Sequence, residues 1–120
     1  MKIHYLSHSG VSIEDKFIIL IDPWLTDNPL ARIKAENITE ADYIIATHNH
    51  SDHVIDIPII AKNTSATIIG IVETVEDLTT KGCNKTIGCN IGGKVKLEGI
   101  ELVFTQAFHS MSSNPSGVII

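Results

Sequence analysis

An apolar run that ends in a cluster of histidines constrains the fold more than any other feature of this chain. Residues 43–46 (Tyr-Ile-Ile-Ala) have the composition of a buried strand. The next residues place three imidazoles and a carboxylate within six positions, as His48, His50, Asp52 and His53. A strand that stops beside a polar loop presents such side chains at a surface, and they suit Zn²⁺ and related ions. The junction therefore predicts a metal site, in preference to a merely solvated polar loop.

Length and composition predict one soluble globular domain over residues 1–120, or part of one. The hydrophobic fraction of 43% with 19% charged residues argues against disorder. The net charge is −5 and lysine and arginine do not cluster, so nucleic acid is a disfavoured partner. No apolar run reaches the roughly 20 residues of a membrane span, and the amino end does not resemble a secretory signal. We therefore expect a cytoplasmic location without membrane partners.

The two cysteines, Cys83 and Cys89, are expected to be free thiols. The cytoplasm is a reducing compartment, where disulfides are rare. Their spacing also fits no common zinc ribbon, so neither is a predicted ligand.

The first half of the chain alternates strands and helices. Short β-rich runs at residues 3–5, 11–13 and 17–21 predict antiparallel hairpins, and the third run lacks alternation, which indicates a strand covered on both faces. A helix is expected over residues 54–62, but Pro58 requires it to be short or to start later than Val54. A strand at 66–70 and an amphipathic helix at 72–78 follow, which is typical of an α/β protein.

The second half is predicted to be mostly β. Four glycines between residues 82 and 93 indicate loops, after which residues 94–98 and 100–105 form a hairpin around Gly99. Residues 118–120 begin a further strand that lacks a partner. We therefore expect a second half-domain to be supplied by the same precursor, by another chain or by a symmetry copy.

The histidine cluster predicts two neighbouring ions. His48 and His50 lie on the same side of an extended backbone and can bind one ion. Asp52 and His53 come after the chain has turned and are better placed to bind a second ion. Two ions about 3.5–4 Å apart would share a water, which is the expected nucleophile.

The first ion needs a third protein ligand, and His109 is the natural candidate. It follows the strand 100–105 and has serines around it, which resembles the strand-end setting of the first motif. Taken alone, His109 is better explained as an ordinary surface histidine, but the earlier motif reverses this preference.

Three further residues have a possible role at the site. His8, in a polar loop, is a candidate catalytic residue as a substrate contact or proton carrier, whereas His4 in a strand is expected to be structural. Asp22 ends the strand 17–21, where it either accepts a hydrogen bond from a ligand imidazole or is a turn aspartate before proline. Trp24 is expected in the core or in a pocket wall.

The motif His48-x-His50-x-Asp52-His53, with residues 20–24 before it and 107–110 after it, resembles the metallo-β-lactamase superfamily. The resemblance is to its uncharacterised metal-dependent hydrolases, whose relatives include lactonase-like enzymes. It implies an αββα sandwich with a mixed sheet and flanking helices. It also implies a first metal at His48, His50 and His109, a second metal at Asp52 and His53, and a supporting role for Asp22.

The chain departs from the family pattern near its carboxyl end. The pattern includes a bridging aspartate on a later strand and a further histidine, and this sequence contains neither. We therefore expect the N-terminal half of the family's domain. Its first site would be complete with a water, but Asp52 and His53 are only two ligands and would hold a second ion poorly.

The expected function is that of a metal-dependent hydrolase. Metal-bound hydroxide would attack an ester, lactone or phosphodiester bond of a small metabolite, with Asp52 and His8 as catalytic residues. Zn²⁺ is the expected ion, one or two per chain, and Mn²⁺ and Fe²⁺ are alternatives. The competing interpretation is a non-catalytic metal-binding or assembly module left by loss of the second half-domain.

Overall fold

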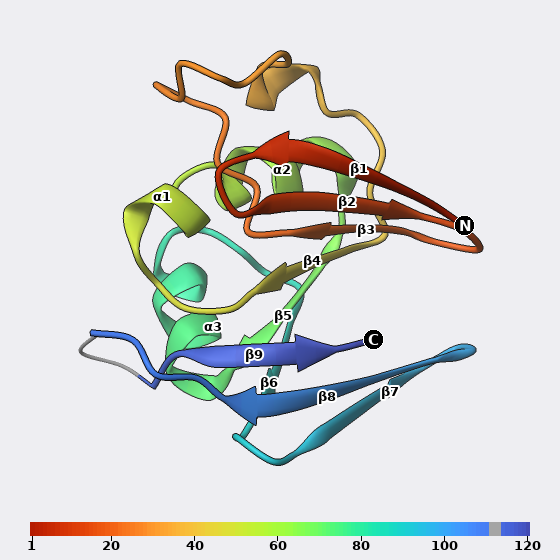
Figure 1. Ribbon diagram of the computed structural model, residues 1–120, viewed down its shortest axis with the longest axis vertical. Helices are drawn as coiled ribbons and strands as arrows, with labels where there is room; N and C mark the ends of the chain where they lie inside the picture. Colours follow the sequence, from red (N-terminus) through yellow and green to blue (C-terminus); the bar gives the residue numbers. More distant parts are fainter. Residues whose placement is uncertain (111–113) are drawn as a thin grey trace.

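The computed structural model describes residues 1–110 and 114–120. The elements follow one another in the order shown in Figure 1. The strands are β1 (Lys2–Ser7), β2 (Gly10–Glu14), β3 (Ile18–Ile21), β4 (Tyr43–Ala46), β5 (Thr67–Ile71), β6 (Thr86–Cys89), β7 (Lys94–Leu97), β8 (Ile100–Gln106) and β9 (Ser116–Ile119). The α-helices are α1 (Ser51–Val54), α2 (Ile57–Thr64) and α3 (Val72–Thr80), and a 3-10 turn spans Ala35–Asn37. Within the described ranges, no helix has the length and apolar character of a membrane span.

Six strands form a mixed sheet in the order β1-β2-β3-β4-β5-β6. The pairs β1–β2 and β2–β3 are antiparallel, which confirms the predicted opening hairpins. From β3 onwards the strands are parallel, with Ile19 opposite Tyr43 and Tyr43 opposite Thr67. Because β3, β4 and β5 run in one direction, the loops that follow them emerge at a single edge of the sheet.

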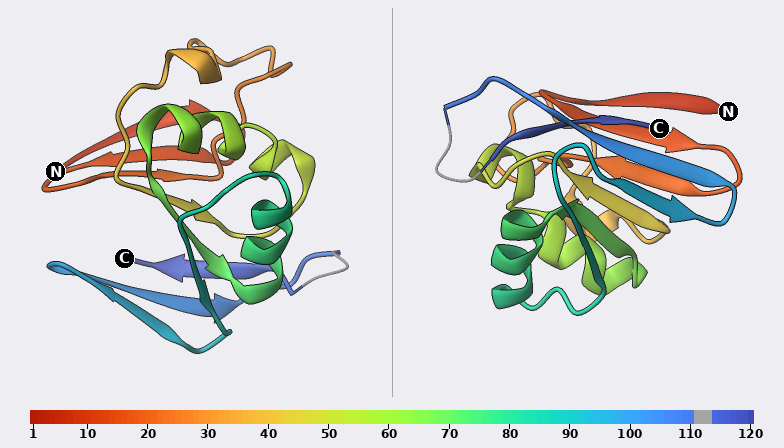
Figure 2. Two further views of the ribbon diagram at one scale, coloured as in Figure 1. Left: turned by 180° about the vertical axis from the view of Figure 1, so that it is seen from behind. Right: turned by 90° about the horizontal axis from the view of Figure 1, so that it is seen from below.

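Both faces of this sheet are covered, because successive side chains of a strand point to opposite sides. On β4, Ile44 packs with Ile57 and Ile60 of α2, whereas its neighbour Ile45 packs with Phe104 of β8. Figure 2 shows α2 and α3 on one side of the sheet. The uniformly apolar composition of β3 and β4 follows from this double burial, as predicted for residues 17–21.

The second sheet contains β7, β8 and β9, all antiparallel. The expectation that the last strand lacks a partner was wrong, because β9 pairs with β8, with Phe104 opposite Val118. Its inner residues Val95, Leu102 and Phe104 pack against Ile45 and Ile69 of the first sheet. Helices, mixed sheet and second sheet make three layers, which correspond to half of an αββα sandwich. The predicted fold class is confirmed.

The position of Pro58 explains how the chain continues after the histidine motif. A single helical turn, α1, begins at Ser51, earlier than expected. The main helix, α2, then starts at Ile57, so Pro58 falls in its first turn, where a missing backbone N–H costs nothing. The alternative of a later helix start is therefore the one observed.

A second expectation was also wrong: the glycine-rich stretch 82–93 contains the strand β6. This strand pairs in parallel with β5, with Gly70 opposite Gly88. A Cβ at Gly88 would lie 3.2 Å from Val72 Cγ2 and 3.3 Å from Val75 Cγ2, both on α3. Gly88 therefore marks the close approach of a helix to a strand and not a loop.

Candidate metal centre

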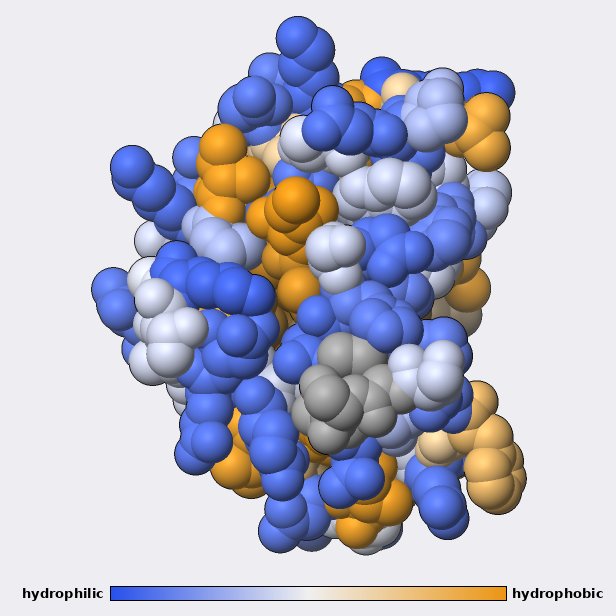
Figure 3. Space-filling view, turned by 90° about the vertical axis from the view of Figure 1, so that its left-hand side faces the viewer, coloured by the Kyte–Doolittle hydropathy of each residue, from blue (hydrophilic) through white to orange (hydrophobic). Residues whose placement is uncertain are grey.

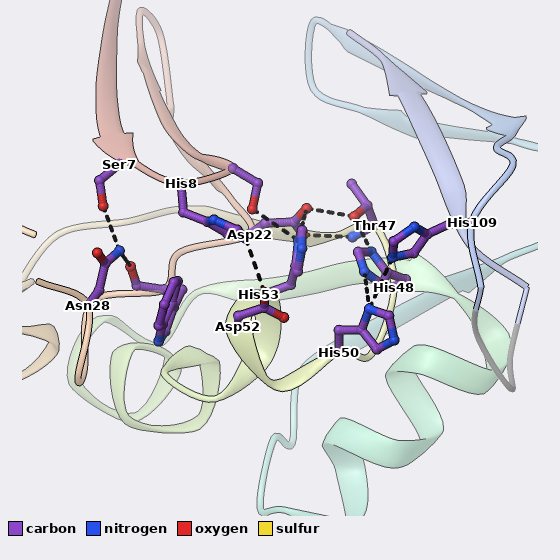
Figure 4. A network of polar contacts seen from close by, with 12 residues as sticks. Ser7, His8, Asp22, Asn28, Thr47, His48, His50, Asp52, His53 and His109 are labelled. Atoms are coloured by element: carbon purple, nitrogen blue, oxygen red, sulfur yellow. Dashed lines mark hydrogen bonds and ion pairs between the residues drawn. The ribbon is translucent and has the colours of Figure 1, made fainter. Parts of the chain in front are cut away.

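The edge of the first sheet that follows β3 and β4 gathers the candidate residues. His48 and His50 come directly after β4, and α1 turns Asp52 and His53 back towards the same place. His8 lies in the turn between β1 and β2, and Asp22 follows β3. Figure 4 shows these side chains converging with His109, which follows β8.

Three imidazole nitrogens converge at what we call the first cluster, His48, His50 and His109. His50 Nδ1 lies 3.1 Å from His48 Nε2 and 3.0 Å from His109 Nε2. Two ligands bound at about 2.0–2.1 Å to one tetrahedral ion lie about 3.3 Å apart, so the separations are close to those of a shared ion. All three ligand atoms lie within 4.8 Å of one another. The donor set therefore fits a divalent ion with an open fourth position.

His48 is held in the form that a metal ligand needs. Its Nδ1 lies 2.9 Å from Thr47 Oγ1, and that hydroxyl donates to Asp22 Oδ2 at 2.6 Å. The hydroxyl can therefore only accept from His48, which places the proton on Nδ1 and leaves Nε2 free. Burial, helped by the charge of the neighbouring His53, lowers the pKa of His48 to about 4. The ring is accordingly neutral near pH 7.

Asp22 connects the motif to β3. Its carboxylate is buried and accepts hydrogen bonds from Thr47 N at 2.8 Å, from Thr47 Oγ1 and from His53 Nδ1 at 2.9 Å. It also lies in a turn, with φ of 43°. Asp22 thus lies in a turn and also accepts a hydrogen bond from His53, which is one of the predicted ligands.

The two ring nitrogens of His53 have different roles: Nδ1 hydrogen-bonds within the protein, and Nε2 is the candidate metal ligand. Burial lowers the pKa of His53, but the hydrogen bond and the charge of Asp22 together raise it above its ordinary value. Ser9 Oγ lies 3.1 Å from the same Nδ1. With Nδ1–H donating to Asp22, the lone pair of His53 is on Nε2.

The remaining ligand candidates form what we call the second cluster, His8, Asp52 and His53. His8 Nε2 lies 3.1 Å from Asp52 Oδ2, and both side chains are about two-fifths exposed. The His8 ring stands edge-on to Trp24, with centroids 5.1 Å apart, which places Trp24 in the wall of the site. Asp22, His48 and His53 also have ligand atoms within 4.8 Å of one another. The carboxylate of Asp22, however, already accepts hydrogen bonds from Thr47 and His53.

Sequence reasoning did not assign roles to two residues beside the first cluster. Thr47 relays the carboxylate of Asp22 to His48, and Ser116 at the start of β9 donates to Thr47 O through both N, at 3.0 Å, and Oγ, at 2.8 Å. The position of Thr47 between strand and motif was a signal that could have identified it. Ser116 had no such signal. His4, as expected, lies outside the site and pairs with Glu14 at 3.5 Å.

The molecular surface on the side of α1 is mainly hydrophilic (Figure 3). The polar ends of the loops gather on this side, whereas the apolar residues of β3, β4 and β5 lie in the layers behind them. An exposed polar edge on a rigid sheet is the setting in which metal ligands remain accessible to a solute.

Fold and site together define half of a metal-binding αββα sandwich. The sequence identifies it further: residues 18–120 match the family model described as the beta-lactamase superfamily domain. The chain belongs to the beta-lactamase superfamily, which confirms the resemblance seen in its motifs.

Curated relatives carry the name UPF0173 metal-dependent hydrolase. One from Thermofilum pendens is 39% identical over 99% of this chain and 55% of its own length. One from Thermoplasma volcanium is 41% identical over 100% of this chain and 56% of its own length. The chain thus spans about half the length of the curated relatives that it matches.

Among solved structures, a metallo hydrolase from the hyperthermophilic archaeon Ignicoccus hospitalis is similar. The two share 35% sequence identity with a TM-score of 0.86. The match covers 98% of this chain and 54% of the other. The three layers described above therefore correspond to about half of that metallo hydrolase structure.

Proposed function

We propose that this chain provides the metal centre of a hydrolase that acts on an ester, lactone or phosphodiester bond of a small molecule. The observation that supports this most directly is the convergence of three imidazole nitrogens in the first cluster. Neutral imidazoles that face one another with lone pairs repel unless a proton or a cation lies between them. A cation satisfies all three together.

The chain's own residues supply a preorganised setting for this chemistry. A divalent ion bound there would acidify a water and polarise the bond to be cleaved. Asp22, through Thr47, fixes the tautomer of His48, and His50 and His109 bring their nitrogens to the same point. His8 and Asp52 are half-exposed beside it and can contact a substrate or carry a proton.

The ion is proposed to be Zn²⁺, with Mn²⁺ and Fe²⁺ as alternatives. A set of three nitrogen ligands with an open position is typical of catalytic zinc. The relatives are named only as metal-dependent, which supports a metal without deciding its identity. A small molecule is the proposed substrate, because the net charge of −5 disfavours nucleic acid. A second half-domain, from the same precursor, another chain or a symmetry copy, is the proposed partner.

The test measures metal content, intact mass and turnover on one preparation. The purified chain is assayed with a p-nitrophenyl ester, a lactone and bis-p-nitrophenyl phosphate, before and after chelation and after addition of Zn²⁺, Mn²⁺ or Fe²⁺. We expect hydrolysis of at least one substrate, its loss on chelation and its return with metal. His50→Ala, with an unchanged circular dichroism spectrum, should lose both metal of the first cluster and turnover.

Two results would contradict the proposal in different ways. Turnover that survives chelation and the His50→Ala change would exclude a metal mechanism at this site. Metal binding at the first cluster without turnover on any substrate would favour the non-catalytic metal-binding module. An intact mass above that calculated for 120 residues would show that the assayed molecule contains more than these residues.

A further inference from the structure

We propose that His8 is the third protein ligand of a second metal ion, which it binds together with Asp52 and His53. This inference rests on the proposed metal dependence of the chain and deepens it. Sequence reasoning counted only Asp52 and His53 at the second position and therefore expected poor binding. The structure brings a third ligand from the turn between β1 and β2, about forty residues away in the sequence.

The distances within the second cluster support a shared ion. His8 Nε2 and Asp52 Oδ2 are 3.1 Å apart, near the separation of about 3.3 Å that two ligands of one tetrahedral ion show. One ligand atom from each of the three residues lies within 4.8 Å of the other two. The ring of His8 also stands edge-on to that of His53, with centroids 5.5 Å apart. In Figure 4, His8 and Asp52 face each other across a dashed line, and the His53 ring lies beside them.

The hydrogen bonds of His53 leave the correct atom free. Its Nδ1 is engaged by Asp22 and lies beside Ser9, so Nε2 carries the lone pair. A ligand imidazole whose other nitrogen donates to a carboxylate is the usual arrangement at protein metal sites. Asp22 therefore provides for the second cluster the same support that it provides, through Thr47, for the first.

The backbone around His8 is held in an unfavourable conformation that places the imidazole at this point. Ser7 and His8 are consecutive residues with positive φ, 99° and 52°. The turn is fixed by Tyr5 Oη, which donates to His8 O at 3.0 Å, and by Asn28 Nδ2, which donates to Ser7 Oγ at 2.6 Å. The contact between His8 and Asp52 is about two-fifths exposed and contributes little to stability in water. The two hydrogen bonds therefore hold the turn independently of that contact and present the His8 imidazole next to Asp52.

The second ion would lie next to the first. His48 of the first cluster and His53 of the second have ring centroids 4.0 Å apart. Two ions on adjacent ligands can bind one substrate oxygen between them, which suits ester, lactone and phosphodiester bonds. With His8 counted, the described part of the chain offers three protein ligands for each ion. His8 would then bind the ion in place of the substrate contact or proton transfer suggested above.

The test is the number of ions per chain in His8→Asn, measured by elemental analysis and by Co²⁺ titration followed by absorbance. Asparagine tolerates positive φ, so this change retains the turn. His4→Asn is the matched control, because His4 is a neighbouring histidine outside the site. We expect two ions in the unchanged chain and in His4→Asn, and one in His8→Asn, with the affinity for the second ion at least about 100-fold weaker.

Each other result has a distinct meaning. Two ions in His8→Asn with unchanged affinity would overturn the role of His8. One ion in the unchanged chain, lost in His50→Ala, would also overturn it while leaving the proposed metal-dependent function intact. No ion in the unchanged chain would overturn both. Circular dichroism of each variant shows whether the fold is retained, and His8→Asp, which offers a carboxylate in the same turn, checks the assignment if His8→Asn unfolds.

Discussion

The first cluster and the second cluster lie side by side, but the protein holds them in different ways. His48, in the first cluster, is only 6% exposed, and its pKa is lowered by burial. His8 and Asp52, in the second cluster, are about two-fifths exposed. The first cluster is supported by the end of a buried strand, whereas the second depends on a strained turn between two antiparallel strands. Similar ligands can thus be positioned by core packing or by local backbone constraint.

This difference predicts that the two clusters respond to different substitutions. Changes near β4 and Thr47 should affect the first cluster, and changes near the β1–β2 turn should affect the second. Asp22 is the exception, since it contacts Thr47 and His53 directly. The following variants separate these cases.

Asp22→Ala should have the largest effect and should remove the distinction between the clusters. Three donors lose their buried acceptor, so the free energy of unfolding should fall by roughly 3 kcal/mol, and binding at both clusters should be lost. Urea denaturation in metal-free buffer and elemental analysis measure the two effects. Asp27→Ala is the control, because Asp27 also has a positive φ, 57°, but is exposed. Normal binding of both ions in Asp22→Ala would refute this role.

Thr47→Val should weaken the first cluster selectively. The change keeps the shape of the side chain but removes the hydroxyl between Asp22 and His48. We expect affinity for the first ion to fall by about 10–100-fold, which is typical for loss of a residue that orients a ligand. Isothermal titration with Zn²⁺ measures this. Thr67→Val, at the opposite end of the parallel strands, should leave the affinity unchanged, and an equal loss in both variants would count against the relay.

Asn28→Ala should weaken the second cluster without changing the first. The buried amide of Asn28 donates to Ser7 Oγ and to Trp24 O, so its loss loosens the turn that carries His8. The free energy of unfolding should fall by about 1–2 kcal/mol. Co²⁺ titration should show the second binding step weakened, and the first step retained. A loss confined to the first step would contradict the comparison.

The smallest effect concerns the cysteines, which lie outside both clusters and report on the fold. Burial raises the pKa of the Cys83 thiol above its ordinary value of 9.0, whereas Cys89 is half-exposed. A thiol reagent at pH 8 should therefore modify one cysteine per native chain and the second only on unfolding. The pKa of Cys83 is higher in the folded chain than in the unfolded chain. The contribution of this thiol to the free energy of unfolding is therefore complete below pH 9 and is lost as the pH rises through the folded pKa. Two fast-reacting thiols in the native chain would show that Cys83 is not buried.

Much of the fold could be predicted because its signals are local. The double burial of β3 and β4 is visible in their uninterrupted apolar residues, and the end of β4 is marked by the motif itself. The first cluster was also accessible, since His109 follows a strand in the same kind of setting as His48. The family resemblance, carried by the spacing of these residues, supplied the layers.

The remainder depends on contacts between distant segments. β6 exists because β5 offers it a parallel partner and because α3 packs closely over Gly88, and neither fact is visible in a stretch with four glycines. The proximity of His8 to Asp52 depends on the positive φ values of Ser7 and His8, which no pattern of residue types indicated. Ser116 donates to Thr47 O across 69 positions of the chain.

The position of Asp22 between the clusters has a thermodynamic consequence. The carboxylate of Asp22 hydrogen-bonds to His53 directly and to His48 through Thr47. An ion bound at either cluster therefore changes the electrostatic potential at the same two carboxylate oxygens. The two binding events are then linked, and by reciprocity each ion must alter the affinity for the other by the same factor. Titrations that begin with either ion already bound should yield a single coupling constant. The centre would then respond to metal supply as one cooperative unit.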